Sequence, residues 1–116
     1  MDEYTFRLAT VDDADAFSPL LASLGYPCDT VVLRERISRI SGHSDEMILV
    51  ATRAAGEDSV VGLLSIHFIP QLGLEGDVAR IGFLVVDERV HNLGIGKMLE
   101  SRAEELARER GCNRMV

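Results

Sequence analysis

Cysteine is scarce in this sequence, and its placement excludes two classes of small protein. The two cysteines, Cys28 and Cys112, are far apart and belong to no Cys-x-x-Cys or Cys/His cluster. A disulfide framework needs several cysteines in pairs, and a zinc site needs its ligands at short, fixed spacings. We therefore expect two reduced thiols, no metal centre and the reducing environment of the cytoplasm.

Long apolar runs are also missing. The longest run, residues 60–69, is interrupted by Gly62, Ser65 and His67, whereas a membrane-spanning helix needs about 18 or more apolar residues. The first ten residues, MDEYTFRLAT, carry acidic side chains and lack the apolar core of a signal peptide. These absences predict a cytoplasmic protein with no membrane partner.

Basic residues are outnumbered by acidic ones. The chain has 12 Lys and Arg against 19 Asp and Glu, which gives a net charge of −7. Binding to nucleic acids or anionic membranes depends on clustered Lys and Arg, so we expect neither partner. A length of 116 residues, 47% of them hydrophobic, predicts a single domain over residues 1–116 with its own core.

The spacing of apolar residues predicts alternating strands and helices. Alternation with period two indicates a strand, a period near 3.6 indicates a helix, and Gly or Pro marks the connections. In chain order we expect a strand at 3–9, a helix ending at Gly25, a helix at 30–40, strands at 47–53, 59–69 and 78–86, a long helix at 94–110 and the start of a further strand at 112–116, with AAGED at 54–58 as a hairpin turn.

Three features within these elements carry further predictions. Pro19 should kink the first helix or make it restart with Ser18 as a new N-cap, because proline has no N–H to donate. Gly82 should mark a β-bulge or a close backbone approach in a strand that is apolar enough to be covered on both faces. The long helix should bury a stripe of residues at three- and four-residue spacing: Ile95, Met98, Leu99, Ala103 and Leu106.

Gly94 and Gly96 stand one residue apart where the long helix should begin, although glycine in a helix costs about 1 kcal/mol relative to alanine. A Walker P-loop would match only Gly96-Lys97, and a dinucleotide fingerprint would need a glycine where Leu99 stands, so both fail. Two interpretations remain. The glycines belong either to an ordinary strand-to-helix turn or to a helix N-terminus whose free N–H groups bind a phosphate.

The surrounding run, IGFLVVDERVHNLGIGKMLESRAEELARERG, resembles motif A of the GNAT superfamily of N-acetyltransferases. The family signature Gln/Arg-x-x-Gly-x-Gly/Ala stands here as HNLGIG, with His91 in the first position. The resemblance covers residues 4–116. It implies an α/β (α+β) three-layer fold, in which a mixed, mostly antiparallel twisted sheet is flanked by helices and ends early in the fifth strand.

The resemblance implies acetyl-CoA as co-substrate. In the family, the pantetheine arm pairs with the strand backbone that matches Phe83 to Val86, and the pyrophosphate lies on the loop that matches His91 to Lys97. Gly94 and Gly96 would then leave room for phosphate oxygens to reach the amides, and Lys97 is either a further phosphate contact or an ordinary surface lysine. The implied cofactor-binding residues are Leu84, Val85, Val86, His91, Asn92, Leu93, Gly94, Ile95, Gly96 and Lys97.

The implied reaction is direct transfer of an acetyl group to a primary amine of a small molecule or peptide, with an N–H near Val86 as oxyanion donor. Where some members carry a basic Glu, this sequence has Arg80, so the catalytic base is unknown. His67 is a candidate. It is either a base that acts through water or an ordinary hydrogen-bonded strand residue. Glu75 and Asp77 lie nearby in the sequence.

The family usually supplies its leaving-group acid from a tyrosine on a helix beyond the last strand of this sequence, and neither Tyr4 nor Tyr26 matches it. The resemblance therefore implies a domain that is C-terminally incomplete. Two functions stay open at this point. One is an acetyl-CoA-dependent N-acetyltransferase, and the other is a non-catalytic CoA-binding or dimerisation module whose exposed C-terminal sheet edge pairs with a second copy.

Overall fold

The structure, a computed structural model, describes residues 4–53 and 59–116, without the side chains of His91 and Asn92. The turn expected at 54–58 therefore lies outside the described residues. The elements follow the expected order: β1 (Tyr4–Leu8), the 3-10 turn η1 (Val11–Asp13), α1 (Ala14–Ser23), α2 (Thr30–Ser41), β2 (Glu46–Arg53), β3 (Ser59–Pro70), β4 (Asp77–Val86), the 3-10 turn η2 (Glu88–Leu93), α3 (Ile95–Glu109) and β5 (Arg114–Met115).

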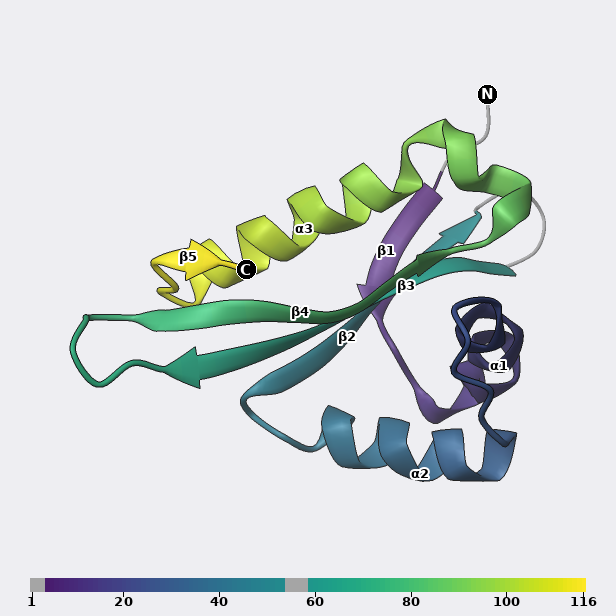
Figure 1. The fold of residues 1–116 in the computed structure, drawn as a ribbon, viewed down its shortest axis with the longest axis horizontal. Coiled ribbons are helices and arrows are strands. Elements are labelled where there is room, and N and C mark those ends of the chain that lie inside the picture. Colours follow the sequence, from purple (N-terminus) through teal and green to yellow (C-terminus); the bar gives the residue numbers. More distant parts are fainter. Residues whose placement is uncertain (1–3, 54–58) are drawn as a thin grey trace.

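The five strands form one sheet in the order β1-β2-β3-β4-β5. The first three pairs are antiparallel, and only β4 and β5 run parallel. Figure 1 shows α3 along one face of the twisted sheet and α1 and α2 against the other. The expected three-layer architecture with a mixed, mostly antiparallel sheet is confirmed.

Each face of the sheet carries its own apolar cluster, because successive strand residues point to opposite faces. Under α3, the buried helix residues recur every four positions and are Ile95, Leu99, Ala103 and Ala107. The second cluster joins α1 and α2 to the sheet and includes Phe17, Leu33, Ile37, Val50 and Val85. The loop before α3 is thus held by the first cluster, and the space beside β4 is shaped by the second.

Two predictions about the helices are wrong, namely the restart of the first helix with Ser18 as its N-cap and the burial of Met98, whereas a kink at Pro19 stays a prediction. α1 continues through Pro19 without a restart, and the Ser18 hydroxyl donates to the Cys28 carbonyl at 2.9 Å instead of capping a new helix. One missing hydrogen bond is tolerated because Phe17 and Leu20 on either side are both buried against the sheet. In α3, Met98 is 42% exposed, since strict four-residue spacing of the buried stripe leaves it at the flank.

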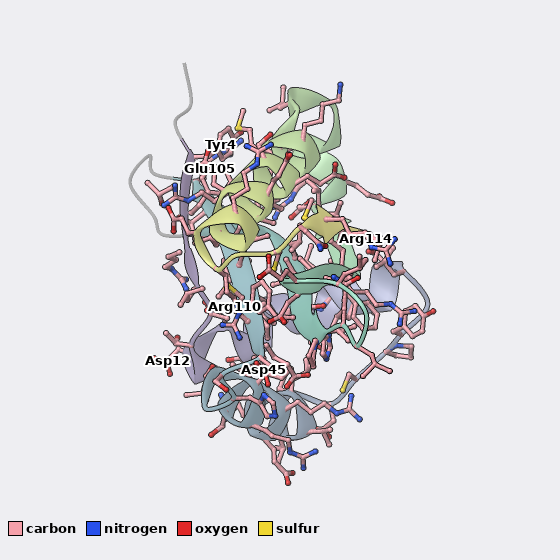
Figure 2. The ribbon with its side chains drawn as sticks, turned by 90° about the vertical axis from the view of Figure 1, so that its left-hand side faces the viewer. Tyr4, Asp12, Asp45, Glu105, Arg110 and Arg114 are labelled. Carbon is pink, nitrogen blue, oxygen red and sulfur yellow. The ribbon has the colours of Figure 1, made fainter. Side chains whose placement is uncertain are left out.

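Arg110 fixes the C-terminal end of α3 to the sheet. Its guanidinium lies over the Phe68 ring, 4.0 Å from the centroid, and its Nη2 donates to the Asp45 carboxylate at 2.8 Å. Figure 2 shows Arg110 and Asp45 close together between α3 and the segment before β2. Gly111 then ends the helix with a φ of 88°.

Candidate active site

β4 is paired along its whole length on one side but only at its start on the other. β3 pairs with it from Asp77 to Val86, whereas β5 pairs at Val78 and Ala79, with one further bond from the Ile81 N–H to the Val116 carbonyl at 2.9 Å. Beyond that bond, no strand among the described residues covers this edge of β4 (Figure 1). A free strand edge can bind an extended ligand as an added strand.

A β-bulge at Gly82 marks the point where the edge opens. The register with β3 passes from Ile66–Ile81 to Ser65–Phe83, so Gly82 is the extra residue. A Cβ at Gly82 would lie 2.9 Å from the Ser65 hydroxyl, which itself accepts a hydrogen bond from the Phe83 N–H at 2.9 Å. The structure therefore confirms both the bulge and the close approach expected at Gly82.

Leu84 and Val86 direct their backbone groups toward the open edge. The Asp87 N–H donates to the Val61 carbonyl of β3 at 2.7 Å, and the Val85 carbonyl also faces β3. Because the direction of the N–H and C=O groups alternates along a strand, the two residues beside Val85 point the other way. Two N–H groups and two carbonyls thus line the unpaired part of β4.

α3 begins beside this edge with backbone amides that have no partner within the helix. Gly94 is its N-cap, and the Gly94 carbonyl accepts the first helical bond, from the Met98 N–H at 3.1 Å. The N–H groups of Ile95, Gly96 and Lys97 precede that bond and remain for an external partner. They lie at the positive end of the helix dipole, which favours an anion.

The two glycines of this turn have different local causes. Gly94 has φ 79° and ψ 14°, a left-handed conformation that other residues rarely adopt. Gly96 is not left-handed, and a Cβ there would lie 3.8 Å from Val86 Cγ2, an ordinary contact distance. The packing of the protein therefore permits a side chain at Gly96, and its absence leaves the helix amides accessible next to β4.

Asp87 connects β4 to the turn. Its carboxylate caps η2 by accepting from the Arg89 N–H at 2.9 Å, and it also pairs with the Arg89 guanidinium, with Nη2 at 2.6 Å from Oδ2. These hydrogen bonds from Arg89 lower the pKa of the Asp87 carboxyl below its ordinary value of 3.8. The turn between the open edge and the α3 amides is thus held by local contacts.

On the α1/α2 face, a cavity of about 340 Å³ adjoins the start of the open edge. It lies between α1, α2, the turn before α2, the start of β2 and the middle of β3 and β4. Most of its lining is apolar. The lining residues are Phe17, Leu21, Tyr26, Pro27, Cys28, Leu33, Arg36, Ile37, Ile40, Glu46, Met47, Ile48, Leu63, Ser65, Ile66, His67, Gly82 and Phe83.

His67 and Glu46 form a pair in the wall of this cavity. They are opposite each other in the β2–β3 ladder, and His67 Nε2 contacts Glu46 Oε1. The Glu46 side chain is 19% exposed and the His67 side chain 49%. Glu46 lies 3.9 Å from His43 Nδ1 as well. A carboxylate that holds one nitrogen of an imidazole leaves the other nitrogen able to accept a proton.

The structure places the sequence-predicted residues unequally. Lys97 and Leu93 are exposed, while the Ile95 side chain is fully buried, so that only its N–H can serve a ligand. The side chains of His91 and Asn92 lie outside the described part of the chain. Glu75 and Asp77 do not line the cavity. Glu46 was not predicted from the sequence. Its only signal was its place immediately before an apolar strand, and the sequence does not show which residue of the next strand lies opposite it.

Within residues 4–53 and 59–116, no helix is long and apolar enough to cross a bilayer, and no group of three or more His, Cys, Asp and Glu side chains is arranged to hold a metal ion. Both cysteines are free thiols.

Comparison with known proteins identifies the family. The model of the acetyltransferase (GNAT) family matches residues 14–116, which is most of the chain. This protein belongs to the GNAT acetyltransferase family. No curated protein sequence matches this GNAT chain significantly. Family membership supports acyl transfer in general.

Solved structures share the GNAT fold with this chain. A GNAT family acetyltransferase from Staphylococcus aureus subsp. aureus USA300_TCH1516 superposes with a TM-score of 0.86 at 24% identity, over 99% of this chain and 84% of that one. Glucosamine-6-phosphate N-acetyltransferase from Arabidopsis thaliana gives 0.83 at 19% identity, over 98% and 80%. Ribosomal-protein-alanine N-acetyltransferase from Brucella melitensis biovar Abortus 2308 gives 0.74 at 21% identity, over 97% and 77%.

Proposed function

We propose that this protein is an acetyl-CoA-dependent N-acetyltransferase that transfers the acetyl group directly to a primary amine of a small molecule or peptide. The observation that carries the proposal is the convergence of two backbone surfaces. The open edge of β4, at Leu84 and Val86, lies next to the free amides at the start of α3. An extended chain that ends in a pyrophosphate needs both surfaces together.

The residues present fit a CoA thioester. Leu84 and Val86 would hold the pantetheine amides as an added strand, and the N–H groups of residues 95–97 would hold the pyrophosphate. Gly96 leaves space that a Cβ would otherwise fill. Lys97, which is exposed at the same helix end, would add a charge-assisted contact in an acidic protein. His91, Asn92 and Leu93 remain predicted contacts, as does Val85, although its carbonyl faces β3 and its side chain is buried.

The chemistry would take place where the edge begins. A backbone N–H of Leu84 or Val86 would stabilise the oxyanion that forms on the thioester carbonyl. The cavity on the α1/α2 face has Gly82 and Phe83 in its wall, so an amine held there would lie beside that carbonyl. Two structures similar to this chain carry names that specify N-acetyltransferases, which supports nitrogen as the acceptor atom.

Calorimetric titration with acetyl-CoA tests the binding half of the proposal. Wild type should bind one equivalent, and Gly96→Glu should bind at least tenfold more weakly because its carboxylate would occupy the phosphate position. Gly73→Glu is the matched control, since it makes the same charge change where nothing lies within 4 Å of a Cβ. Equal affinities of wild type and Gly96→Glu for acetyl-CoA would show that the pyrophosphate does not bind at this turn.

Turnover separates the enzyme from the alternative, a CoA-binding or dimerisation module. Release of CoA thiol in the presence of primary amines would establish the transferase. Binding of acetyl-CoA without amine-dependent release would favour the module. In that case the short β5, which pairs with β4 on one side, would be the edge for a second copy, and light scattering should report a dimer.

A further inference from the structure

The cavity on the α1/α2 face has a mostly apolar lining with a carboxylate and an imidazole in its wall, and this combination indicates a substrate class. Building on the proposed N-acetyltransferase function, we propose that the cavity selects primary amines carried on an apolar body, and that Glu46 and His67 receive the amine and take its proton. His67 would be the catalytic base. Glu46 would be a positioning residue that also supplies the negative charge for the ammonium group.

The cavity is built to exclude water from an apolar group. Its volume of about 340 Å³ falls at the lower end of the range of about 300–1,000 Å³ for small-molecule pockets. Leu33, Ile37 and Leu63 in its wall are each at most 5% exposed. Tyr26 and Phe83 meet edge to face across the wall, with ring centroids 5.3 Å apart, and both remain partly exposed. An aliphatic or aromatic body would gain by displacing water there.

The cavity lining carries two charged side chains, Glu46 and Arg36, and His67 beside Glu46. Glu46 contributes a carboxylate that is mostly withdrawn from solvent. Of the cations, Arg36 lines the cavity, and Arg80 lies beside His67 in the sheet. Arg36 is exposed, and its Nη1 donates to Cys28 Sγ at 3.3 Å, while Arg80 is exposed on the strand position opposite His67. Solvent screens exposed guanidinium groups more than it screens a half-buried carboxylate. An ammonium group is therefore drawn to the Glu46 side of the cavity.

The pair also has the geometry of an oriented base. His67 Nε2 faces Glu46 Oε1, so the carboxylate holds the tautomer in which Nδ1 carries the lone pair. Nδ1 removes one proton from the ammonium, and the freed amine forms the C–N bond to the thioester carbonyl carbon. The C–S bond then breaks, and the second amine proton ends on the CoA thiolate. The proton held by His67 passes to solvent, so that one proton is released per turnover.

A series of amines measures the specificity. Ethylamine, butylamine and hexylamine should give kcat/KM values that rise by about fourfold for each methylene group buried. Hexane-1,6-diamine is the matched probe, because it keeps the chain length and places a second charge in the apolar part. It should react at least tenfold more slowly than hexylamine. A preference for the diamine, spermidine or an amino sugar would overturn the proposed substrate class.

Variants of His67 and Glu46 test the catalytic role of each residue. His67→Ala should lower kcat about 100-fold or more, with acetyl-CoA affinity unchanged, and added imidazole should restore part of the rate. Glu46→Gln should lower kcat and raise the KM of hexylamine, and Glu46→Asp should recover part of both losses. His43→Gln is the control. His43 is the other imidazole near Glu46 but does not line the cavity, so this substitution should change kcat less than twofold. Full kcat in His67→Ala would overturn the base assignment.

A wall variant tests the cavity independently of the pair. Ile40→Gln puts an amide into the cavity wall and should flatten the chain-length dependence. Val31→Gln, on the same helix and 69% exposed, should leave it unchanged. If no amine reacts and acetyl-CoA does not bind, the proposed function fails as a whole. If amines react without dependence on chain length, His67 or Glu46, only this inference fails.

Discussion

The Ser65 hydroxyl accepts a hydrogen bond from the Phe83 N–H at 2.9 Å, across the bulge that separates the paired and unpaired parts of β4. The bond replaces a ladder contact that the extra residue Gly82 has displaced. It keeps the Phe83 N–H satisfied, and it sets the alternation in which Leu84 and Val86 face the open edge. A side-chain hydroxyl on β3 therefore helps to decide which backbone groups of β4 are offered to a ligand.

Gly82→Ala should destabilise the protein, because its Cβ would lie 2.9 Å from the Ser65 hydroxyl. Overpacking of this kind costs about 1–3 kcal/mol. In a Ser65→Ala background the obstacle is gone, so the same substitution should cost about 1 kcal/mol less. Urea unfolding of the two single variants and the double variant measures this coupling. Additive free energies of unfolding would show that the two residues do not interact.

Gly96→Ala should separate stability from binding. Alanine is favoured over glycine inside a helix by about 0.5–1 kcal/mol, and the added Cβ meets only an ordinary contact with Val86, so the free energy of unfolding should rise. Acetyl-CoA should bind more weakly, because the methyl group stands over the helix amides. Thermal unfolding and calorimetry on one preparation give both values. Unchanged affinity would mean that no ligand approaches this residue.

Asp13 should make stability depend on pH in the acid range. Burial opposes its ionisation, but hydrogen bonds from Arg7 and from the Thr10 N–H outweigh that effect and lower the pKa of the carboxyl below 3.8. Both Arg7 terminal nitrogens lie 2.8 Å from its oxygens. The pKa of Asp13 is thus lower in the folded state than in the unfolded state. The stabilisation from its charge is complete when the pH is above the unfolded-state pKa, and it is lost as the pH falls through the folded-state pKa.

Asp13→Asn should accordingly lower the free energy of unfolding at pH 7 by about 1.5–3 kcal/mol, the range for hydrogen bonds to a charged group. The difference from wild type should shrink as pH falls below 3.8, because Asp13 is then increasingly protonated in wild type as well. Urea titrations of both proteins at pH 7 and pH 3 provide the comparison. An equal difference at the two pH values would rule out the charge as its source.

Asp87 and Arg89 should differ in importance although they pair with each other. Asp87→Ala removes the cap of η2 and should cost about 1 kcal/mol, and it should weaken acetyl-CoA binding by loosening the turn before α3. Arg89→Gln should change little, because the Arg89 side chain is 85% exposed and solvent screens an exposed ion pair. Urea unfolding and calorimetry test both variants, and equal losses would contradict this assignment.

Local chemistry explains why much of the fold was predictable. The glycine turn, the amphipathic helix that follows it and the closing Gly111 are adjacent in the chain, so motif and geometry are recognised together. The bulge at Gly82 was predictable, because a glycine inside an apolar strand usually marks a bulge or a close backbone approach. The predicted restart at Pro19 was wrong because burial of Phe17 and Leu20 against the sheet stabilises the helix. That burial depends on tertiary packing, which local sequence rules do not include.

The sequence by itself therefore determined the element order, the family and the turn at Gly94 and Gly96, because each depends on neighbours in the chain. Tertiary structure alone decided that Glu46 meets His67, since that contact depends on the register between β2 and β3. It also decided which backbone groups of β4 are free, because the bulge and the short β5 together determine where pairing stops. Long-range pairing is a property of the folded sheet, and no short segment encodes it.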